Sequence, residues 1–444
     1  MKWFVFLVAS LSIISSHAQQ SPANPPQKDI LNNFYVSIPK NRQELPDLTD
    51  KGFKLRGTKG WNWTPEQTLA EIPYLKKFKM NFFMNCYTSM FDYPNSNDWW
   101  KPFSDDFKKK YEEIVKACKE NDIEFCFALN PNLFSSRHFD YNSKKDQEDL
   151  WQHYKWMAGL GVNWFSVCLD DISKGLDAAG QARMVNALLK RIRKINPKAQ
   201  MVFCPTVYAS SYTVKGISDN TAYLSTLAKE LDKDVYCFWT GDYVCGPITE
   251  AKAREFKEII GHRLIIWDNY PVNDGHQAMH LGPVVQRDPG LAAYCEGYMA
   301  NAMRTQNEFN RIPLYTVADY TLDPENYDPL NSIGQAVLHL SKTPEQARTL
   351  ADAVDVYYGF LLSKSVHNCG FNTARAAFQN LLAQQHGYTA ASAFLSKLRQ
   401  VRKRLDHQFP GMYAAEMKTI DTDIRWMEEN IQLKYPPFPL DREK

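Results

Sequence analysis

The segment Val167–Ile172 (VCLDDI) is an apolar, partly β-branched run that ends in two adjacent carboxylates. It belongs to a longer strand candidate, Asn163–Asp171. Adjacent buried acids repel each other, so Asp170 and Asp171 are expected to titrate at two different pKa values, as acid–base chemistry requires. The same pair also fits a helix cap, a turn or a solvated loop. Other parts of the chain have to distinguish these interpretations.

Strand-like runs alternate with helical patterns along most of the chain. Asp105–Glu120 and Ala178–Lys194 carry apolar residues at spacings of three and four, and Thr64–Gln67 (TPEQ) forms a capping box that marks a helix start. Eight β/α repeats over roughly 270 residues predict an α/β fold, the (β/α)₈ TIM barrel. The strand candidates are Phe53–Lys59, Met80–Cys86, Glu124–Asn130, Asn163–Asp171, Gln200–Tyr208, Val235–Gly241, Arg263–Asn269 and, last, either Gly297–Asn301 or Leu314–Tyr320.

After Glu325 the pattern changes to helices alone, which predicts a small helical domain beside the barrel. A second capping box, Thr343–Gln346 (TPEQ), opens one of these helices. The expected helices are Asp328–Leu340, Thr343–Leu362, Ala374–Gln385, Ala390–Leu405 and Met412–Ile431. The chain is thus expected to comprise a signal peptide (1–18), a lead-in segment (19–50), a catalytic barrel (51–325) and a C-terminal helical domain (326–444).

The N-terminus is typical of a secretory signal peptide. Lys2 is followed by an apolar run, Trp3–Ser15, of about 13 residues, and small residues stand near Ala18. This run is too short to span a membrane, and no later stretch reaches that length. We expect cleavage after Ala18 and export of the mature protein to the periplasm or the medium.

The charge balance of the chain argues against nucleic acid as a partner. The chain has 52 basic and 50 acidic residues, a formal net charge of +2, and it carries no basic block. It therefore lacks the electrostatic pattern of a nucleic-acid-binding protein. Its 11 tryptophans and 23 tyrosines suit sugar stacking, but they equally suit a large core.

The cysteines are predicted to be buried hydrophobic side chains. There are nine of them, an odd number, and five lie in apolar strand-like runs: Cys86, Cys126, Cys168, Cys204 and Cys237. Small thiols in such runs usually pack in the core, so we do not expect a disulfide framework despite the oxidising compartment.

Polar residues gather where four of the candidate strands end. These ends are Asp170–Asp171, Pro205–Tyr208, Trp239–Asp242 and Trp267–Asp274. Active sites of TIM barrels occupy the loops that follow the carboxyl ends of the strands, which all meet at one mouth. The sequence therefore predicts a site there, built from carboxylates, amides and aromatic rings.

Seven short motifs follow one another along the barrel: Phe127–Pro131 (FALNP), Asp170–Ile172 (DDI), Cys204–Tyr208 (CPTVY), Trp239–Gly241 (WTG), Trp267–Asp274 (WDNYPVND), His280–Pro283 (HLGP) and Asn301–Met303 (NAM). In this order they resemble the catalytic domain of glycoside hydrolase family 84. That family contains the O-GlcNAcases and bacterial β-N-acetylglucosaminidases, including enzymes labelled hyaluronidases. The resemblance extends from about Phe53 to Pro329, and WDNYPVND is its most specific part.

The resemblance implies a retaining glycosidase that uses the substrate's own 2-acetamido oxygen as nucleophile, without a cofactor or metal. Asp170 would orient and polarise the acetamido N–H while an oxazoline forms. Asp171 would protonate the leaving oxygen and later activate water. The expected partner is a glycan or glycoconjugate that bears terminal β-linked N-acetylglucosamine.

The resemblance also implies six substrate-binding residues. Tyr208 would hydrogen-bond near the reacting centre, Asn269 would brace the acetamido pocket, and Trp267 would form part of its apolar wall. Asp274 and Asn301 would bind outer sugar hydroxyls, and Gly57 would provide a backbone contact on the first strand. A loop hydrogen bond or core packing is the alternative role for each side chain.

Two departures from the family pattern lie on the sugar-binding rim. On the first strand, Gly57–Gly60 (GTKG) stands where the family usually has Gly-Phe-Tyr-Gly, so Thr58 and Lys59 are unusual. On the second strand, Thr88 lies at or near the position of a family lysine that contacts a sugar hydroxyl. Lys59, on the neighbouring strand, is a candidate replacement for that lysine. Both changes affect the expected substrate more than the reaction class.

Two rival interpretations stay open. A metal-dependent hydrolase could use His276 and His280, with Asp268 or Asp274 as oxygen ligands, although Gly275 and Gly282–Pro283 disfavour a regular helix there. Alternatively, the barrel binds carbohydrate and has lost catalysis or changed its specificity. The natural glycan, exo or endo action and the oligomeric state do not follow from the sequence.

Overall fold

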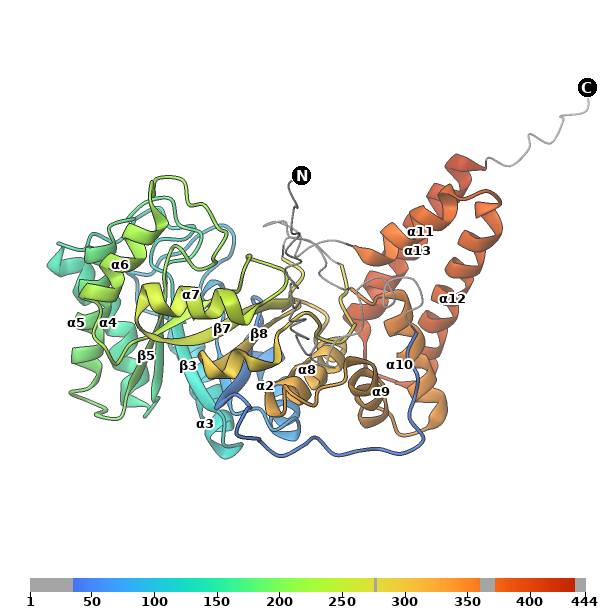
Figure 1. The fold of residues 1–444 in the computed structure, drawn as a ribbon, viewed down its shortest axis with the longest axis horizontal. Coiled ribbons are helices and arrows are strands. Elements are labelled where there is room, and N and C mark those ends of the chain that lie inside the picture. Colours follow the sequence, from blue (N-terminus) through green and yellow to red (C-terminus); the bar gives the residue numbers. More distant parts are fainter. Residues whose placement is uncertain (1–34, 275–277, 360–371, 436–444) are drawn as a thin grey trace, which may run out of the picture.

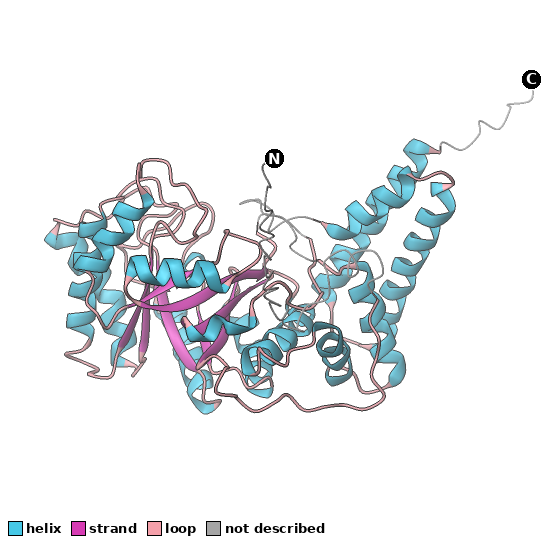
Figure 2. Ribbon diagram, in the orientation of Figure 1, coloured by secondary structure: helices cyan, strands magenta, loops and turns pink. Residues whose placement is uncertain are grey.

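The computed structural model describes residues 35–274, 278–359 and 372–435. Within them, eight parallel strands pair in chain order and close into a barrel (Figure 1, Figure 2). The prediction of a (β/α)₈ barrel is confirmed. The strands are β1 (Leu55–Gly60), β2 (Phe82–Met84), β3 (Glu124–Leu129), β4 (Trp164–Cys168), β5 (Gln200–Cys204), β6 (Tyr236–Trp239), β7 (Arg263–Pro271) and β8 (Cys295–Ala302).

Helices cover the outside of the barrel. The capping box predicted at Thr64 is present, because the Thr64 hydroxyl accepts from Gln67 N at 3.2 Å and the Gln67 side chain accepts from Thr64 N at 2.9 Å. The covering elements are α2 (Pro65–Lys77), α3 (Asp105–Glu120), α4 (Lys144–Gly159), α5 (Ala178–Ile192), α6 (Asn220–Glu230), α7 (Glu250–Ile260) and α8 (Asn307–Leu322). Two 3₁₀ helices, η1 (Tyr87–Met90) and η2 (Pro289–Ala293), lie in the loops that follow β2 and β7.

Each strand is buried on both faces, which explains its continuous apolar sequence. On β3, Cys126 and Ala128 belong to the core inside the barrel. The alternate residue Phe127 faces outward and packs its ring edge-to-face on Tyr154 of α4, with ring centroids 5.4 Å apart. The strands therefore contribute to two cores, one inside the barrel and one beneath the helices.

Several predicted strands were too long at their carboxyl ends. β4 stops at Cys168 and β5 stops at Cys204, before the polar residues that follow each of them. The open choice for the last strand is also settled, because β8 spans Cys295–Ala302 and Leu314–Tyr320 lies inside α8. α8 is buried along most of its length, so its sequence lacks the polar face that usually marks a helix.

The C-terminal helices pack beside the barrel and then extend away from it (Figure 1). Thr343 caps its helix, because its hydroxyl accepts from Gln346 N at 3.2 Å, but the predicted capping box is only half formed, since Gln346 Oε1 accepts from Lys342 N at 2.7 Å. The helix ends at Val356, and part of the predicted extension to Leu362 lies outside the described residues. No helix in the described ranges is long and apolar enough to cross a membrane. These helices are α9 (Pro329–His339), α10 (Pro344–Val356), α11 (Thr373–Ala383), α12 (Gly387–Gln408) and α13 (Ala414–Lys434).

The described part of the lead-in segment, residues 35–50, connects the helical region to the barrel. Val36 N donates to Asp355 of α10 at 2.8 Å, and Gln43 N donates to Gln335 of α9 at 2.9 Å. Further along, Lys79 Nζ donates to the carbonyl oxygen of Leu45 at 2.9 Å, just after α2. The segment thus lies along both parts of the molecule (Figure 1).

The five strand-like cysteines are free and buried, as predicted, and so are Cys118 and Cys295. Cys245, in the loop after β6, differs because it is disulfide-bonded. One such bond is compatible with a core built mainly from hydrophobic packing.

Candidate active site

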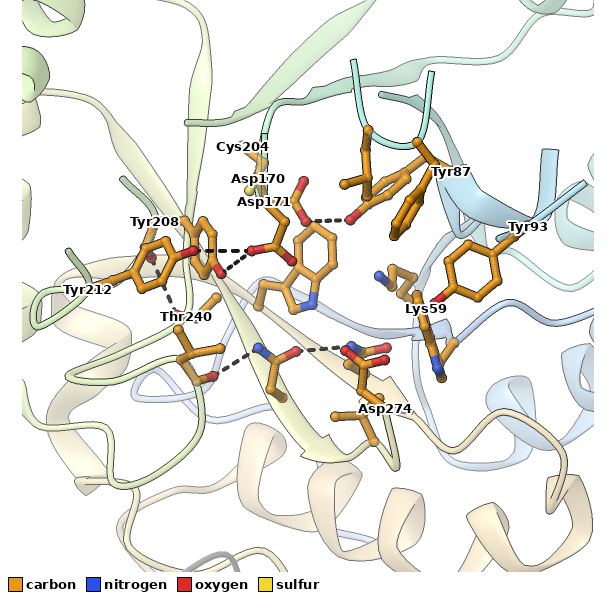
Figure 3. A pocket seen from close by; sticks show the side chains of 18 residues that line it. Lys59, Tyr87, Tyr93, Asp170, Asp171, Cys204, Tyr208, Tyr212, Thr240 and Asp274 are labelled. Atoms are coloured by element: carbon orange, nitrogen blue, oxygen red, sulfur yellow. Dashed lines mark hydrogen bonds between the residues drawn. The ribbon is translucent and has the colours of Figure 1, made fainter. Parts of the chain in front are cut away.

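A cavity of about 500 Å³ opens at the carboxyl ends of the barrel strands (Figure 3). Seven of the eight residues predicted to catalyse the reaction or bind substrate line it: Asp170, Asp171, Tyr208, Trp267, Asn269, Asp274 and Asn301. They come from the ends of β4, β5, β7 and β8, or from the loops that follow these strands. The predicted convergence of strand ends at one mouth is therefore present in the fold.

Asp170 lies in a buried position just past the end of β4. Leu169 N still donates to Cys204 O at 2.9 Å, so strand pairing continues up to the residue before it. Asp170 as a whole residue is 7% exposed, and its Oδ2 accepts a hydrogen bond from the Tyr87 phenol. Its Oδ1 is buried without a hydrogen-bond partner in the described structure. That oxygen can accept an N–H from a molecule in the cavity.

Asp171 lies at the exposed side of the same turn. Its φ of 54° is left-handed, which is uncommon for a residue other than glycine and breaks the alternation of a strand. Because of this turn, two adjacent carboxylates face one cavity instead of opposite faces of the sheet. Asp171 Oδ1 accepts from Tyr208 Oη at 2.7 Å, and Tyr212 Oη lies 3.5 Å away (Figure 3).

The two acids have different electrostatic surroundings. Burial raises the pKa of Asp170 to about 6, and the neighbouring charge of Asp171 adds to this effect. The positive charge of Lys59 and the hydrogen bond from Tyr87 act in the opposite direction. Burial also raises the pKa of the Tyr87 phenol well above its ordinary value, so this phenol keeps its proton and remains a donor.

The far side of the cavity is formed by β7 and β8. Asn269 Nδ2 donates to Val244 O at 2.8 Å, and Asn269 Oδ1 accepts from Asn301 Nδ2 at 2.9 Å. Both ends of the Asn269 amide are therefore held by protein. Asn301 Oδ1 and Trp267 Nε1 are buried without a partner in the described residues.

Gly57 is the predicted binding residue that does not line the cavity. A Cβ at this position would lie 1.7 Å from the carbonyl oxygen of Phe82, so glycine permits the close approach of β1 to β2. Thr58 is also directed away from the cavity, because its hydroxyl donates to Ala300 O at 2.9 Å. Lys59, the next residue, does reach the cavity. Thr88, in η1, contacts the preceding Cys86 and lies outside the cavity lining.

Sequence reasoning missed several aromatic residues of the site. Tyr87 and Tyr212 contact the two acids, while Trp61 and Tyr93 line the cavity on the side of β1 and β2. Tyr87 comes shortly after the end of β2, in the motif that contains Thr88, so its place near a strand end was a usable signal. Tyr212 lies in a loop, and no pattern in the sequence indicates that it reaches Asp171.

Two candidate ligands of the rival metal site, Asp268 and His280, are described and lie outside the cavity lining. Arg287 donates to both oxygens of Asp268, at 2.6 and 2.9 Å, and Tyr298 donates to Oδ2. These contacts occupy Asp268 beneath the cavity. His280 is buried outside the cavity lining, and His276 lies outside the described residues.

Paired carboxylates at the mouth of a TIM barrel, in a cavity walled by aromatic rings, are typical of a barrel glycoside hydrolase. A family model described as beta-N-acetylglucosaminidase matches residues 56–354. The chain belongs to this family, glycoside hydrolase family 84. The family resemblance inferred from the barrel motifs is thereby confirmed.

Known proteins give a consistent comparison. Protein O-GlcNAcase of Rattus norvegicus and its counterpart of Mus musculus are each 25% identical over 275 residues, which cover 60% of this chain. The chain matches 29% of the length of these curated relatives. A structure of a Thermobaculum terrenum O-GlcNAc hydrolase mutant superposes with a TM-score of 0.68 and 23% identity, covering 85% of this chain and 83% of that one. This likeness supports the fold.

Proposed function

We propose that the protein is a retaining β-N-acetylglucosaminidase that hydrolyses terminal β-linked N-acetylhexosamine by substrate-assisted catalysis. The observation that carries this proposal is the asymmetry of the acid pair. Asp170 is buried and has an unpaired oxygen, whereas Asp171 is exposed beside two phenols. One acid therefore suits an amide N–H, and the other suits a leaving group or water that enters from solvent.

In the first step, the carbonyl oxygen of the substrate's 2-acetamido group attacks C1. The bond between C1 and the leaving oxygen breaks, and Asp171 donates its proton to that oxygen. Asp170 accepts the acetamido N–H and stabilises the positive charge that develops on the oxazoline. Holding the acetamido group in line is an effective-molarity contribution.

In the second step, water attacks C1 from the side that the leaving group has vacated. Asp171, now a carboxylate, removes the proton from this water as the C1–oxazoline bond breaks and the amide is restored. Two inversions at C1 give net retention. The proposed reaction uses no cofactor.

The remaining residues have proposed roles in binding. Trp267 would form the apolar wall of the acetamido pocket, and Asn269, fixed at both ends of its amide, would brace it. Tyr208 would align Asp171, while Asp274 and Asn301 would bind outer hydroxyls of the sugar. We also propose export after removal of residues 1–18, with a glycan or glycoconjugate as the partner.

A panel of aryl glycosides that differ at C2 and C4 tests the proposed function. We expect turnover of the N-acetylglucosaminide, a strict requirement for the acetamido group and a β-anomeric first product by NMR. An α-anomeric first product, or equal turnover without the acetamido group, would exclude substrate assistance. Binding of the sugar without turnover would instead favour a carbohydrate-binding barrel that has lost catalysis.

A further inference from the structure

Lys59 is a buried cation held in the cavity by aromatic rings. The residue is 1% exposed, and its ammonium lies 3.9 Å from the ring centroid of Trp267, 5.1 Å from that of Tyr87 and 5.5 Å from that of Trp61. The ammonium points into the cavity in Figure 3. Among the described residues it has no hydrogen bond or ion pair, unlike the buried guanidinium of Arg287, which contacts Asp268.

An unpaired buried cation is costly, and ring quadrupoles offset only part of that cost. Negative charge within the same cavity can supply part of the remaining compensation. Asp170 is the buried carboxylate there, and Tyr87 connects the two groups, because its ring lies under the ammonium and its hydroxyl donates to Asp170 Oδ2. Lys59 is thus placed to act on Asp170 through space, without a direct contact.

We propose that Lys59 is a positioning residue that keeps Asp170 ionised inside the cavity, and so able to accept the acetamido N–H. This inference rests on the proposed function, in which Asp170 acts as a carboxylate. It differs from a role in sugar binding alone, because it assigns to Lys59 an effect on the chemistry of the acid.

Among the charged groups around Asp170, Lys59 is the one whose replacement tests the proposal. The titratable groups that face Asp170 come from the β4 turn, β1, η1, β4, β5 and the loop after β5. They are Asp171, Lys59, Tyr87, Cys168, Cys204, Tyr208 and Tyr212. Lys59 is the cation of this set. Burial and the charge of Asp171 raise the pKa of Asp170. Without Lys59, only hydrogen bonds lower it, so the pKa of Asp170 rises further.

Lys59→Met removes the charge and keeps the length of the side chain. We expect the acid limb of kcat/KM to move up by about 1 pH unit, a typical effect of a nearby opposite charge. On an aryl N-acetylglucosaminide, kcat/KM then falls about tenfold at pH 5 and less than about twofold at pH 8. Lys59→Gln is a second neutral variant in case the methionine variant does not fold.

Two further variants serve as controls. Lys59→Arg retains the charge and should keep the acid limb close to its wild-type position. Lys101→Met removes a lysine whose ammonium also lies over a tryptophan, 5.9 Å from the centroid of Trp100, but this lysine is exposed and outside the cavity lining. It should leave the pH profile unchanged.

Equal loss of kcat/KM at every pH would overturn the inference and assign Lys59 to sugar binding alone. An unchanged profile would overturn it as well. A ¹³C NMR titration of the Asp170 carboxyl, identified by difference from Asp170→Asn, measures the same effect without turnover. A wild-type protein inactive at all pH values would refute the proposed function, while the NMR shift would still test Lys59.

Discussion

At the scale of single residues, Asp170 and Asp171 are adjacent in sequence, but replacing each of them by asparagine is predicted to affect the hydrolysis rate in a different way. Asp171→Asn removes the proton donor, so substrates with poor leaving groups should lose about 10²–10⁴-fold in rate. Activated aryl leaving groups should lose much less in the first step. Asp170→Asn should impair every substrate, because the acetamido group is no longer oriented. Steady-state rates across a series of aryl leaving groups measure this difference.

An oxazoline-mimicking thiazoline provides a binding test of the same assignment. It resembles the state that Asp170 stabilises, so it should bind wild type far better than Asp170→Asn. The same dependence on the leaving group in both variants would contradict the division of roles.

The raised pKa of Asp170 predicts a pH dependence in the wild-type enzyme. The proposed mechanism needs this acid as a carboxylate, and its pKa is raised to about 6, first by burial. The acid limb of the pH profile should therefore lie near pH 6, with kcat/KM falling about tenfold per pH unit well below it. A pH profile on an activated substrate measures this limb. A limb near the ordinary pKa of an exposed aspartate would show that the buried acid is not the controlling group.

The residues of the site differ in how far the sequence reveals them. Asp170 and Asp171 end an apolar run, and Trp267, Asn269 and Asp274 belong to one specific motif, so local patterns identify them. The cage around Lys59 does not have such a pattern. Its rings come from β7, from η1 and from the segment just after β1, and only closure of the barrel brings them together.

At the scale of elements, α8 and α13 cap each other's N-termini. Neither helix has a hydrogen-bonded side chain at its own N-cap residue. Instead, Glu416 of α13 accepts from Phe309 N at 3.0 Å, and Glu308 of α8 accepts from Tyr413 N at 2.8 Å. These carboxyl oxygens satisfy N–H groups that have no partner within their own helix, so this exchange fixes the two helices to one another.

This arrangement makes stability depend on pH. Burial, and then the charge of Glu308, raise the pKa of Glu416 to about 8. The folded state therefore binds the proton more tightly than the unfolded state does, and its stability falls as pH rises from the ordinary glutamate range towards 8. Glu416→Gln removes this titration. Its free energy of unfolding relative to wild type should increase between pH 5 and pH 8, by on the order of 1–3 kcal/mol.

Denaturant unfolding at several pH values measures the effect. Glu429→Gln is a matched control, because Glu429 is an exposed residue on the same helix. A constant difference between Glu416→Gln and wild type across this pH range would show that Glu416 is not protonated in the folded protein.

Element boundaries show where sequence patterns stop being informative. The range predicted for α3, Asp105–Glu120, is correct, because the helix is amphipathic and Ser104 caps it. β4 and β5 end before their predicted limits, since the polar residues that follow leave the sheet to form the site. Periodicity indicates the element, while the departure of the chain towards a cavity depends on tertiary structure.

At the scale of the whole molecule, the helical region is connected to the loop that carries part of the site. Asn273 Nδ2, next to Asp274, donates to Gln306 Oε1 at 2.9 Å. Gln306 Nε2 in turn donates to Thr419 of α13 at 3.0 Å. The change of sequence pattern near Glu325 predicted a separate domain, but these long-range contacts have no local signature in the sequence.

These connections predict that the barrel and the C-terminal helices unfold together. Within the described residues, every tryptophan except Trp426 lies between residues 61 and 267, so intrinsic fluorescence reports mainly the barrel. Far-UV circular dichroism reports all helices, including α9–α13. Thermal transitions followed by the two probes should coincide, which is the standard test for one cooperative unit.

Gln306→Ala leaves buried partners unpaired and should lower both midpoints together by a few °C, corresponding to about 1–3 kcal/mol. A circular dichroism transition that separates from the fluorescence transition, or a shift in only one of them, would show that the helical region unfolds independently.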